Sequence, residues 1–380
     1  MVSIEPRRGG GRDVLRRTSG GARDPVLRVA LDWTPLLDPP TGVGRYTAQL
    51  ASALTARGVV LTRYAISRGA GRSEATARWR VPTKVVQGAW RRFGKPSIEH
   101  LVGDVDIVHA PNFVLPVTGS IPGVVTIHDL SFLSDTAFPG GHRLRDLVPW
   151  SVQRAARVLV PTEVVKNEVL DYVAIPPERV VVTHEGVSQV FYGATPLSAS
   201  VLAEMGVRPP FALAVGTIEP RKNLPRLLDA WRRAQDALEG WRLVIAGPQG
   251  WGPRLVETPG VTLVGWVGDE TLPGLLAAAE LFCYPSTYEG FGLPPLEAMA
   301  AGVPAIVGRY SAAPEVLGDA AELVDPLDVD AIAGALERLA TDDELRRSYS
   351  RAGKARAASF TWERTAAATL SAYRATLDDG

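Results

Sequence analysis

The sequence predicts an α/β protein with two doubly wound domains that face each other across a cleft. Short apolar runs recur along the chain and alternate with helix-like stretches, a pattern typical of parallel sheets covered by helices on both faces. The pattern restarts near residue 211, after a Pro-, Ser- and Ala-rich segment at 192–200 that fits a linker. A chain of 380 residues is long enough for two domains of ordinary size.

The first domain is expected to span residues 26–195. Its first strand is predicted at 26–31, and a loop with Gly42 and Gly44 then leads into a helix that ends near Arg57. Further strands are predicted at 106–109, 123–127, 157–160 and 180–182, and helices at 143–156 and 162–172. In such sheets ligands bind beyond the carboxyl ends of the strands.

The second domain is expected to span residues 196–360, and a last helix lies within 361–380. Its strands are predicted at 211–215, 242–246, 261–264, 281–284 and 303–307. Residues 1–25 contain six arginines and three acidic residues and no long apolar stretch. We expect a disordered basic tail there, which either touches anionic lipid or, as we favour, is solvated and without a role.

Composition excludes several classes of protein. Lys+Arg and Asp+Glu are 41 each, so net charge provides no general attraction to nucleic acid. The single cysteine, Cys283, excludes an internal disulfide and a cysteine-only metal cage, and its apolar surroundings favour a buried, inert thiol. No apolar run reaches the ~18 residues of a membrane span and no signal peptide is evident, so a cytoplasmic protein is expected.

The most informative segment is YEGFGLPPLE at 288–297, which places Glu289 and Glu297 eight positions apart. Pro294 and Pro295 suit the first turn of a helix. The helix start and the Gly292 backbone would offer unpaired N–H groups to an anion. The arrangement suits a nucleotide diphosphate, with Glu297 on a ribose and Glu289 on a sugar. The backbone of the turn would then lie around the phosphates, and it comprises Gly290, Phe291, Gly292 and Leu293.

A second candidate segment, GTIEPRKN at 216–223, follows a predicted strand and precedes a helix. Arg221 and Lys222 would face a diphosphate, with Gly216 and Thr217 in the same turn. Fixed cations there would stabilise the negative charge on a departing phosphate. The alternative is a solvated Arg-Lys pair, although cations near a helix start oppose the dipole and so favour an anionic partner.

The segment at 288–297, with AAGVP at 300–304, resembles the paired-glutamate motif of retaining glycosyltransferases of family 4, which have the GT-B fold. The resemblance covers residues 26–380 and is strongest at 211–307. It implies that Glu289 faces the donor sugar and that Glu297 holds the ribose hydroxyls. It also implies that the last helix crosses back to the first domain.

The same resemblance extends to other candidates. Lys222 matches a family lysine, whereas Thr217 stands where the family often has arginine, so Arg221 is expected to supply that phosphate contact. His128 follows a predicted strand and matches a family histidine near the donor sugar. We therefore assign His128 to sugar binding and transition-state support; a satisfied structural histidine is the alternative.

Gly42 and Gly44 resemble the family's glycine loop near the donor phosphates, although a simple strand-to-helix turn would look the same. Val267 belongs to a loop that borders the base in the family, and its neighbour Trp266 would either stack or pack. Two D-x-D patterns, at 104–106 and 328–330, lie away from the glutamate motif and are interpreted as chance. The resemblance implies no metal and no cofactor.

No acidic residue lies between Ala75 and Lys95, and the six basic residues of this stretch are interleaved with tryptophan and phenylalanine. This stretch fits either an anionic membrane surface or a lipid-diphosphate acceptor, or else a charged face with a few core aromatics.

The sequence therefore predicts a retaining glycosyltransferase. The resemblance favours GDP-mannose as the donor, with UDP-sugars as the alternative, and a glycan or lipid-linked acceptor. Two other functions remain open at this point: a nucleotide-sugar 2-epimerase of the same fold, and a non-catalytic two-domain sugar-binding protein.

Overall fold

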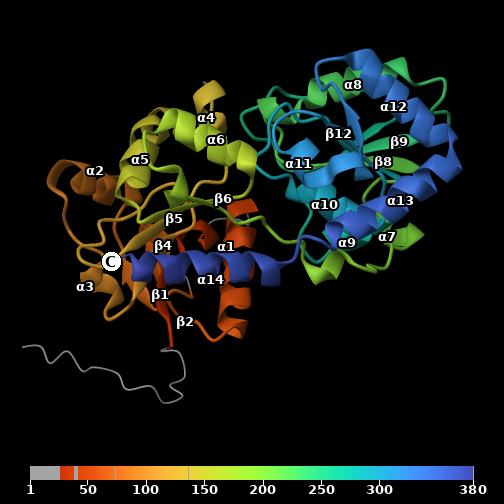
Figure 1. Ribbon diagram of the computed structural model, residues 1–380. Helices are drawn as coiled ribbons and strands as arrows, with labels where there is room; N and C mark the ends of the chain where they lie inside the picture. The colour runs from red at the N-terminus through yellow and green to blue at the C-terminus, as the bar shows by residue number, and fades with distance from the viewer. Residues whose placement is uncertain (1–25, 38–41, 73, 136, 380) are drawn as a thin grey trace, which may run out of the picture.

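The computed structural model describes residues 26–37, 42–72, 74–135 and 137–379. The basic tail predicted at residues 1–25 lies outside the described residues. The chain forms two lobes, each built around a parallel sheet, and Figure 1 shows the first lobe in red to yellow-green and the second in green to blue. The predicted α/β architecture with two doubly wound sheets is confirmed.

Within the described residues, the first sheet has seven strands in the order β3-β2-β1-β4-β5-β6-β7, all paired in parallel. The strands are β1 (Arg28–Asp32), β2 (Val60–Ile66), β3 (Ala77–Trp79), β4 (Ile107–Ala110), β5 (Gly123–Thr126), β6 (Arg157–Val160) and β7 (Val180–Val182). The helices of this lobe are α1 (Gly42–Ala56), α2 (Thr83–Phe93), α3 (Glu99–Val102), α4 (Ser131–Ser134), α5 (Gly141–Arg154) and α6 (Glu163–Tyr172).

The second sheet has six strands among the described residues, in the order β10-β9-β8-β11-β12-β13, again all parallel. The strands are β8 (Phe211–Val215), β9 (Arg242–Ala246), β10 (Val261–Gly265), β11 (Leu281–Tyr284), β12 (Ala305–Gly308) and β13 (Glu322–Val324). The helices are α7 (Ala199–Glu204), α8 (Leu224–Arg233), α9 (Leu272–Ala277), α10 (Leu293–Ala300), α11 (Ala313–Leu317), α12 (Val329–Thr341) and α13 (Asp343–Ala357).

The strand order places the candidate residues. In the second sheet the order reverses between β8 and β11, and a doubly wound sheet binds ligands at such a switch point, beyond the carboxyl ends of the strands. The turn at 216–223 follows β8 and the segment at 285–292 follows β11. β11 is buried along its whole length and β8 along all but its last residue, which fixes the position of these loops.

The last helix, α14 (Trp362–Asp378), returns to the first lobe and runs across it in Figure 1. Trp362, Ala366 and Tyr373 join the buried core that includes Val29 and Ile107 of the first sheet. The phenol of Tyr373 also contacts His109 Nδ1 at 2.7 Å. The helix therefore ties the end of the chain to the lobe in which the chain begins.

Two details differ from the sequence-based expectation. Gly42 and Gly44 lie in the first turn of α1 and not in a loop before it. Strands β2, β3 and β13 were not predicted, since β3 and β13 have three residues each and β2 mixes apolar residues with Thr62 and Arg63. Short or mixed strands lack the continuous apolar run that marks a central parallel strand.

Candidate active site

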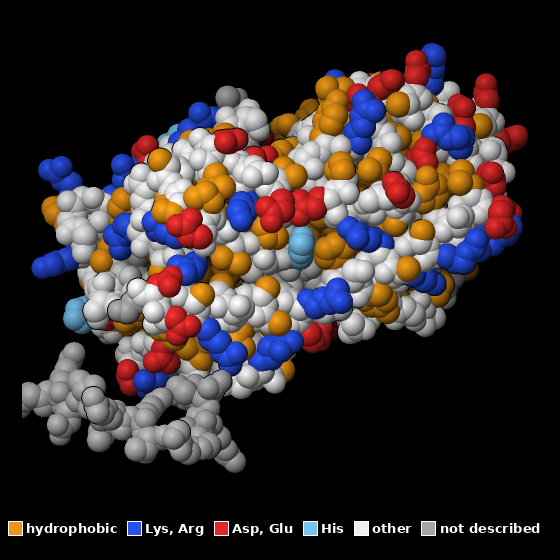
Figure 2. Space-filling model, viewed as in Figure 1, with side chains coloured by type: hydrophobic (Ala, Val, Ile, Leu, Met, Phe, Trp, Pro, Cys, Tyr) orange, Lys and Arg blue, Asp and Glu red, His pale blue; other side chains and the backbone are white. Residues whose placement is uncertain are grey.

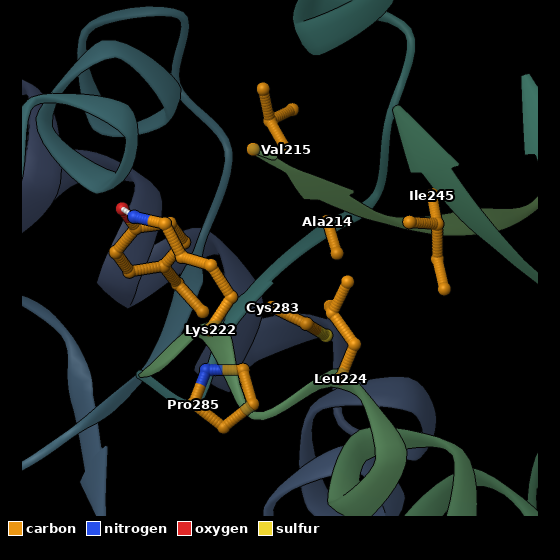
Figure 3. A pocket seen from close by; sticks show the side chains of 9 residues that line it. Ala214, Val215, Lys222, Leu224, Ile245, Cys283 and Pro285 are labelled. Carbon is orange, nitrogen blue, oxygen red and sulfur yellow. Dashed lines mark hydrogen bonds between the residues drawn. The ribbon is translucent and has the colours of Figure 1, made fainter. Parts of the chain in front are cut away.

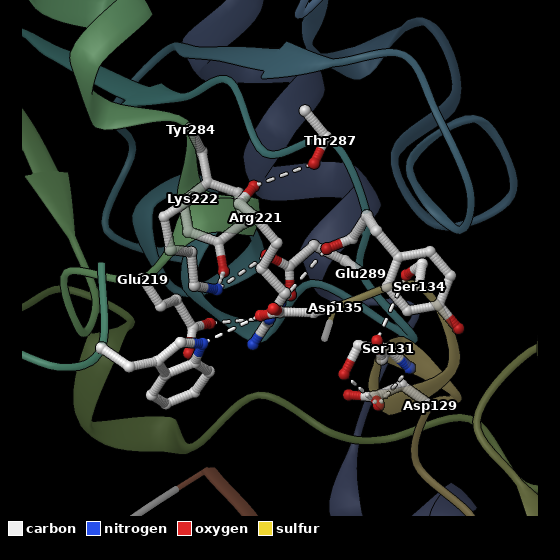
Figure 4. A network of polar contacts seen from close by, with 12 residues as sticks. Asp129, Ser131, Ser134, Asp135, Glu219, Arg221, Lys222, Tyr284, Thr287 and Glu289 are labelled. Carbon is white, nitrogen blue, oxygen red and sulfur yellow. Dashed lines mark hydrogen bonds and ion pairs between the residues drawn. The ribbon is translucent and has the colours of Figure 1, made fainter. Parts of the chain in front are cut away.

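Two cations from the turn after β8 converge on one carboxylate from the loop after β11. Arg221 Nη1 lies 2.5 Å from Glu289 Oε2, and Lys222 Nζ lies 2.7 Å from Glu289 Oε1. Figure 4 shows these three side chains pointing toward one another, with Asp129 and Ser131 of the first lobe opposite them. Glu289 is 68 positions from Arg221 and 67 from Lys222 in the sequence, and the fold brings the three together at the switch point of the second sheet.

Burial and charge set the protonation of this cluster. Burial alone would raise the pKa of Glu289, but Arg221 and Lys222 outweigh it and lower the pKa to about 2. Burial, together with Arg221, lowers the pKa of Lys222. The Lys222 ammonium also donates to the Tyr284 hydroxyl and lies 4.5 Å from the centre of the Tyr284 ring. The two cations are therefore held in fixed positions by their partners.

A second carboxylate completes the cluster. Glu219 Oε1 lies 2.7 Å from Arg221 Nε, and burial raises the pKa of Glu219. Arg221 and Lys222 are thus balanced by Glu219 and Glu289. An incoming diphosphate would compete with these carboxylates for the same N–H groups, and Arg and Lys bind phosphate oxygens well.

Small cavities lie on both sides of the cluster. One is lined by Lys222, Cys283 and Pro285, as Figure 3 shows, and the other by Glu289 and Gly292. Each has a volume of about 10 Å³, which is close to the space that one water molecule needs. Neither of these two cavities is large enough for a nucleotide.

Helix α10 begins beside Glu289. Gly292 precedes it with a φ of 101°, a left-handed conformation that glycine adopts without strain, and no side chain caps the helix. Pro294 and Pro295 lack N–H groups. The donors at this helix start are therefore the amides of Gly292 and Leu293, fewer than an ordinary helix start offers.

Glu297 lies one turn inside α10 and meets a residue of the first lobe. Arg45 Nη1, from α1, lies 3.1 Å from Glu297 Oε1, and the carboxylate side chain is 6% exposed. Burial raises the pKa of Glu297, and the Arg45 guanidinium opposes this rise. The pair joins the two predicted ligand-binding segments, the glycines before Arg45 and the paired-glutamate motif.

His128 lies just beyond β5, with both ring nitrogens engaged. Nδ1 lies 2.9 Å from Glu185 Oε1 and Nε2 lies 2.8 Å from the carbonyl oxygen of Pro111. Burial lowers the pKa of His128, but the hydrogen bond and charge of Glu185 outweigh it, so the pKa is raised. Both partners can accept hydrogen bonds, an arrangement that favours the doubly protonated ring. The predicted contact with a donor sugar stays a prediction.

Comparison with known proteins identifies the family. Residues 204–356 match the family model described as glycosyl transferases group 1, and residues 40–189 match the model described as Glycosyltransferase Family 4. The O-antigen chain mannosyltransferase B of Escherichia coli is 35% identical over 286 residues, which cover 70% of this chain and 74% of that protein. The chain belongs to glycosyltransferase family 4.

Solved structures agree with this assignment at the level of fold. Sucrose-phosphate synthase from Thermosynechococcus elongatus superimposes with a TM-score of 0.74 at 20% identity, over 93% of this chain and 100% of that one. HepE from Anabaena, solved in complex with UDP-glucose, superimposes with a TM-score of 0.66 at 18% identity, over 91% and 99% of the two chains. The GT-B fold expected for this glycosyltransferase is confirmed.

The remaining predicted residues of the glycosyltransferase belong to the second lobe. Thr217 follows Gly216 and packs against Gly250, while Val267 is half-buried beyond β10 and its neighbour Trp266 is exposed. Phe291 is buried against Phe360 and His184. The segments of Thr217 and Phe291 follow β8 and β11 and so flank the switch point, whereas Val267 follows the edge strand β10.

Sequence reasoning missed four residues that the fold adds to this glycosyltransferase site. Arg45 pairs with Glu297, and Glu185 pairs with His128. The Tyr284 hydroxyl accepts a hydrogen bond from Lys222. The hydroxyl of Tyr288 donates to Glu168 at 2.5 Å and accepts from the Leu130 amide at 3.0 Å, across the lobes. Tyr288 opens the recognised motif, but the others carry no local signal, because their partners are 57 to 252 positions away.

The D-x-D patterns and the cysteine have structural explanations. Asp104 and Asp106 pair with Arg28 at the amino end of the first sheet, and Asp328 caps α12. Burial raises the pKa of Cys283 to about 12, so its thiol is not a nucleophile. Among the described residues, no group of three or more His, Cys, Asp and Glu is placed to hold a metal ion, and no helix is long and apolar enough to cross a membrane.

Proposed function

We propose that this glycosyltransferase transfers a sugar from a nucleoside diphosphate sugar to a glycan or lipid-linked acceptor with retention of anomeric configuration. The observation that carries the proposal is the convergence of Arg221 and Lys222 on Glu289, beside the start of α10. We further propose that residues 26–195 contact the acceptor, that residues 196–360 bind the donor, and that the helix at 361–380 crosses back to pack on the first domain.

We propose GDP-mannose as the donor, with UDP-sugars as the alternative. The Escherichia coli relative is named as a mannosyltransferase, which supports mannose. The Anabaena structure holds UDP-glucose, which supports a nucleotide sugar in general and keeps the uridine alternative open. The proposal includes no metal and no cofactor.

In the proposed reaction the bond between the anomeric carbon and the phosphate oxygen breaks first. Negative charge grows on the diphosphate, and Arg221, Lys222 and the amides at the start of α10 stabilise it. Because the diphosphate replaces Glu289 as the partner of both cations, the Glu289 carboxylate becomes free to accept hydrogen bonds from hydroxyls of the sugar ring. The acceptor oxygen then bonds to the anomeric carbon from the same face, and its proton passes to the departing diphosphate.

The test is nucleotide release by the purified protein. GDP-mannose, UDP-glucose and UDP-galactose are each incubated with and without a lipid extract as acceptor, and nucleoside diphosphate is measured. We expect acceptor-dependent release from GDP-mannose and a product with the donor's anomeric configuration by NMR. Conversion of a nucleotide sugar to its C2 epimer without net release of nucleoside diphosphate would support the 2-epimerase. Binding with neither release nor epimerisation would support the non-catalytic sugar-binding protein.

We also propose that α2 and the residues beside it dock on anionic membrane, at the cytoplasmic face of the plasma membrane. Val85 and Phe93 are 63% and 72% exposed, and the same stretch carries Lys84, Arg91, Arg92 and Lys95. Blue side chains project from the left edge of Figure 2, where Figure 1 places α2. Exposed apolar tips among basic side chains suit the interface of an anionic bilayer.

Vesicle sedimentation tests this docking surface. We expect binding to vesicles that contain phosphatidylglycerol, weak binding to phosphatidylcholine vesicles, and loss of the difference in a Phe93→Ser, Arg92→Gln variant. Equally poor sedimentation with both vesicle types would show that α2 is only a solvated face.

A further inference from the structure

Arg45 reaches from the first lobe to a carboxylate of the second, and it leaves half of that carboxylate free. Its Nη1 lies 3.1 Å from Oε1 of Glu297, and the two side chains are 28% and 6% exposed. The other oxygen, Oε2, is buried and has no hydrogen-bond partner among the described residues. The two residues are 252 positions apart in the sequence.

A buried carboxylate oxygen without a donor is costly, so its presence in a ligand-binding segment points to a partner that binds there. A carboxylate accepts hydrogen bonds and donates none while it is ionised. The missing partner of Oε2 is therefore an O–H or N–H group. A ribose hydroxyl of a nucleotide that lies along the start of α10 has this chemistry.

We propose that Arg45 is a positioning residue of the donor site: it holds Glu297 so that Oε2 accepts from a ribose hydroxyl, and it does so only when the two lobes are closed. The inference rests on the proposed donor function, because it needs a nucleotide between the lobes. Arg45 would thus make nucleotide affinity depend on lobe closure, through one contact between α1 and α10.

The charge state of Glu297 supports this role. Burial raises the pKa of Glu297, Asp269 and Glu185 raise it further, and the guanidinium of Arg45 lowers it. Among these groups, removing Arg45 leaves only burial, Asp269 and Glu185, all of which raise the pKa of Glu297. Because the neutral acid is a poorer acceptor, nucleotide affinity falls as the pH falls through the pKa of Glu297. Without Arg45 this fall begins at a higher pH.

The experiment is calorimetric titration of the full chain with GDP, UDP and 2′,3′-dideoxy-GDP at pH 8.0 and pH 5.5. Arg45→Gln, Arg45→Lys and Glu297→Gln are compared with the wild type, and Arg68→Gln serves as a control because Arg68 is an exposed arginine of the same lobe. We expect Arg45→Gln to weaken GDP binding by roughly 10- to 100-fold at pH 8.0, as for a lost charge-assisted hydrogen bond, and more at pH 5.5.

Three results carry the proposal. Arg45→Lys recovers part of the affinity, Arg45→Gln has little further effect in the Glu297→Gln background, and the wild-type preference for GDP over its dideoxy form collapses in Arg45→Gln. A wild type that binds GDP while Arg45→Gln binds it equally at both pH values would overturn the role of Arg45 alone. A wild type that binds neither GDP nor UDP would overturn the proposed donor site, and this inference with it.

Discussion

Gly290 packs directly against the backbone of His128, so closely that a Cβ on Gly290 would lie 1.8 Å from the His128 carbonyl oxygen. The carbonyl of Gly290 in turn accepts from Thr162 Oγ1 at 3.0 Å. The two candidate segments therefore touch through their main chains, and only glycine fits at the contact.

A methyl group at residue 290 is expected to block this contact. In Gly290→Ala the lobes cannot close as they do here, so kcat should fall at least about 100-fold, the size expected when catalytic groups are misplaced by about an ångström. Gly69→Ala in the first lobe is the matched control, because a Cβ there meets only Ser67 Oγ, at 3.8 Å. If Gly290→Ala turns over at the wild-type rate while folded, closure through this contact is not required.

Loss of the Lys222 charge should act on the chemical step. Lys222→Met keeps most of the side-chain volume and removes one of the two cations proposed to face the leaving diphosphate. We expect kcat to fall by about 100-fold or more, as for loss of one preorganised electrostatic contact. Steady-state nucleotide release measures this, with Arg232→Met, an exposed arginine of α8, as the control. Turnover within twofold of the wild type would exclude this role.

Glu289 should make the protein sensitive to acid. Its pKa is about 2 in the folded chain, against an ordinary value of 4.5, so its stabilising contribution is complete above pH 4.5 and is lost as the pH falls toward 2. The shift corresponds to about 3 kcal/mol of unfolding free energy. Between pH 5 and pH 2.5, the free energy of unfolding measured with urea should fall by less in Glu289→Gln than in the wild type, and the difference should be about that amount. An unchanged dependence would contradict the ion pairs described here.

Glu185 should control the charge on His128. The pKa of His128 is raised above its ordinary 6.5 mainly by Glu185, against the effect of burial. The pair therefore stabilises the fold below pH 6.5, and this contribution is lost as the pH rises through the His128 pKa. NMR titration of the ring should give a pKa above 6.5 in the wild type and below it in Glu185→Gln. The His128→Gln spectrum assigns the resonance. The same pKa in both proteins would show that Glu185 is not the cause.

The sequence predicted the central strands because they are buried on both faces. Apolar runs at β5 and β11 predict a parallel sheet, and Pro294 and Gly292 mark the start of α10. The edge strands β3 and β13 have three residues each and no such run. Their pairing depends on neighbours in the folded sheet, which local sequence does not specify.

The site was predictable where its residues lie in one segment and was missed where they meet across the lobes. Glu289, Glu297 and Lys222 stand in recognisable motifs. Arg45 was overlooked beside Gly44, because its partner Glu297 is 252 positions away. Glu185, the partner of His128, stands in a segment without a motif. Such long-range pairs are fixed by how the two lobes meet, which no local pattern encodes.

A crystal structure of the protein soaked with GDP tests the central claim most directly. We predict the diphosphate within hydrogen-bonding distance of Arg221, Lys222 and the amides at the start of α10, with the ribose hydroxyls on Glu297. A nucleotide bound elsewhere, with Glu289 still held by both cations, would contradict it.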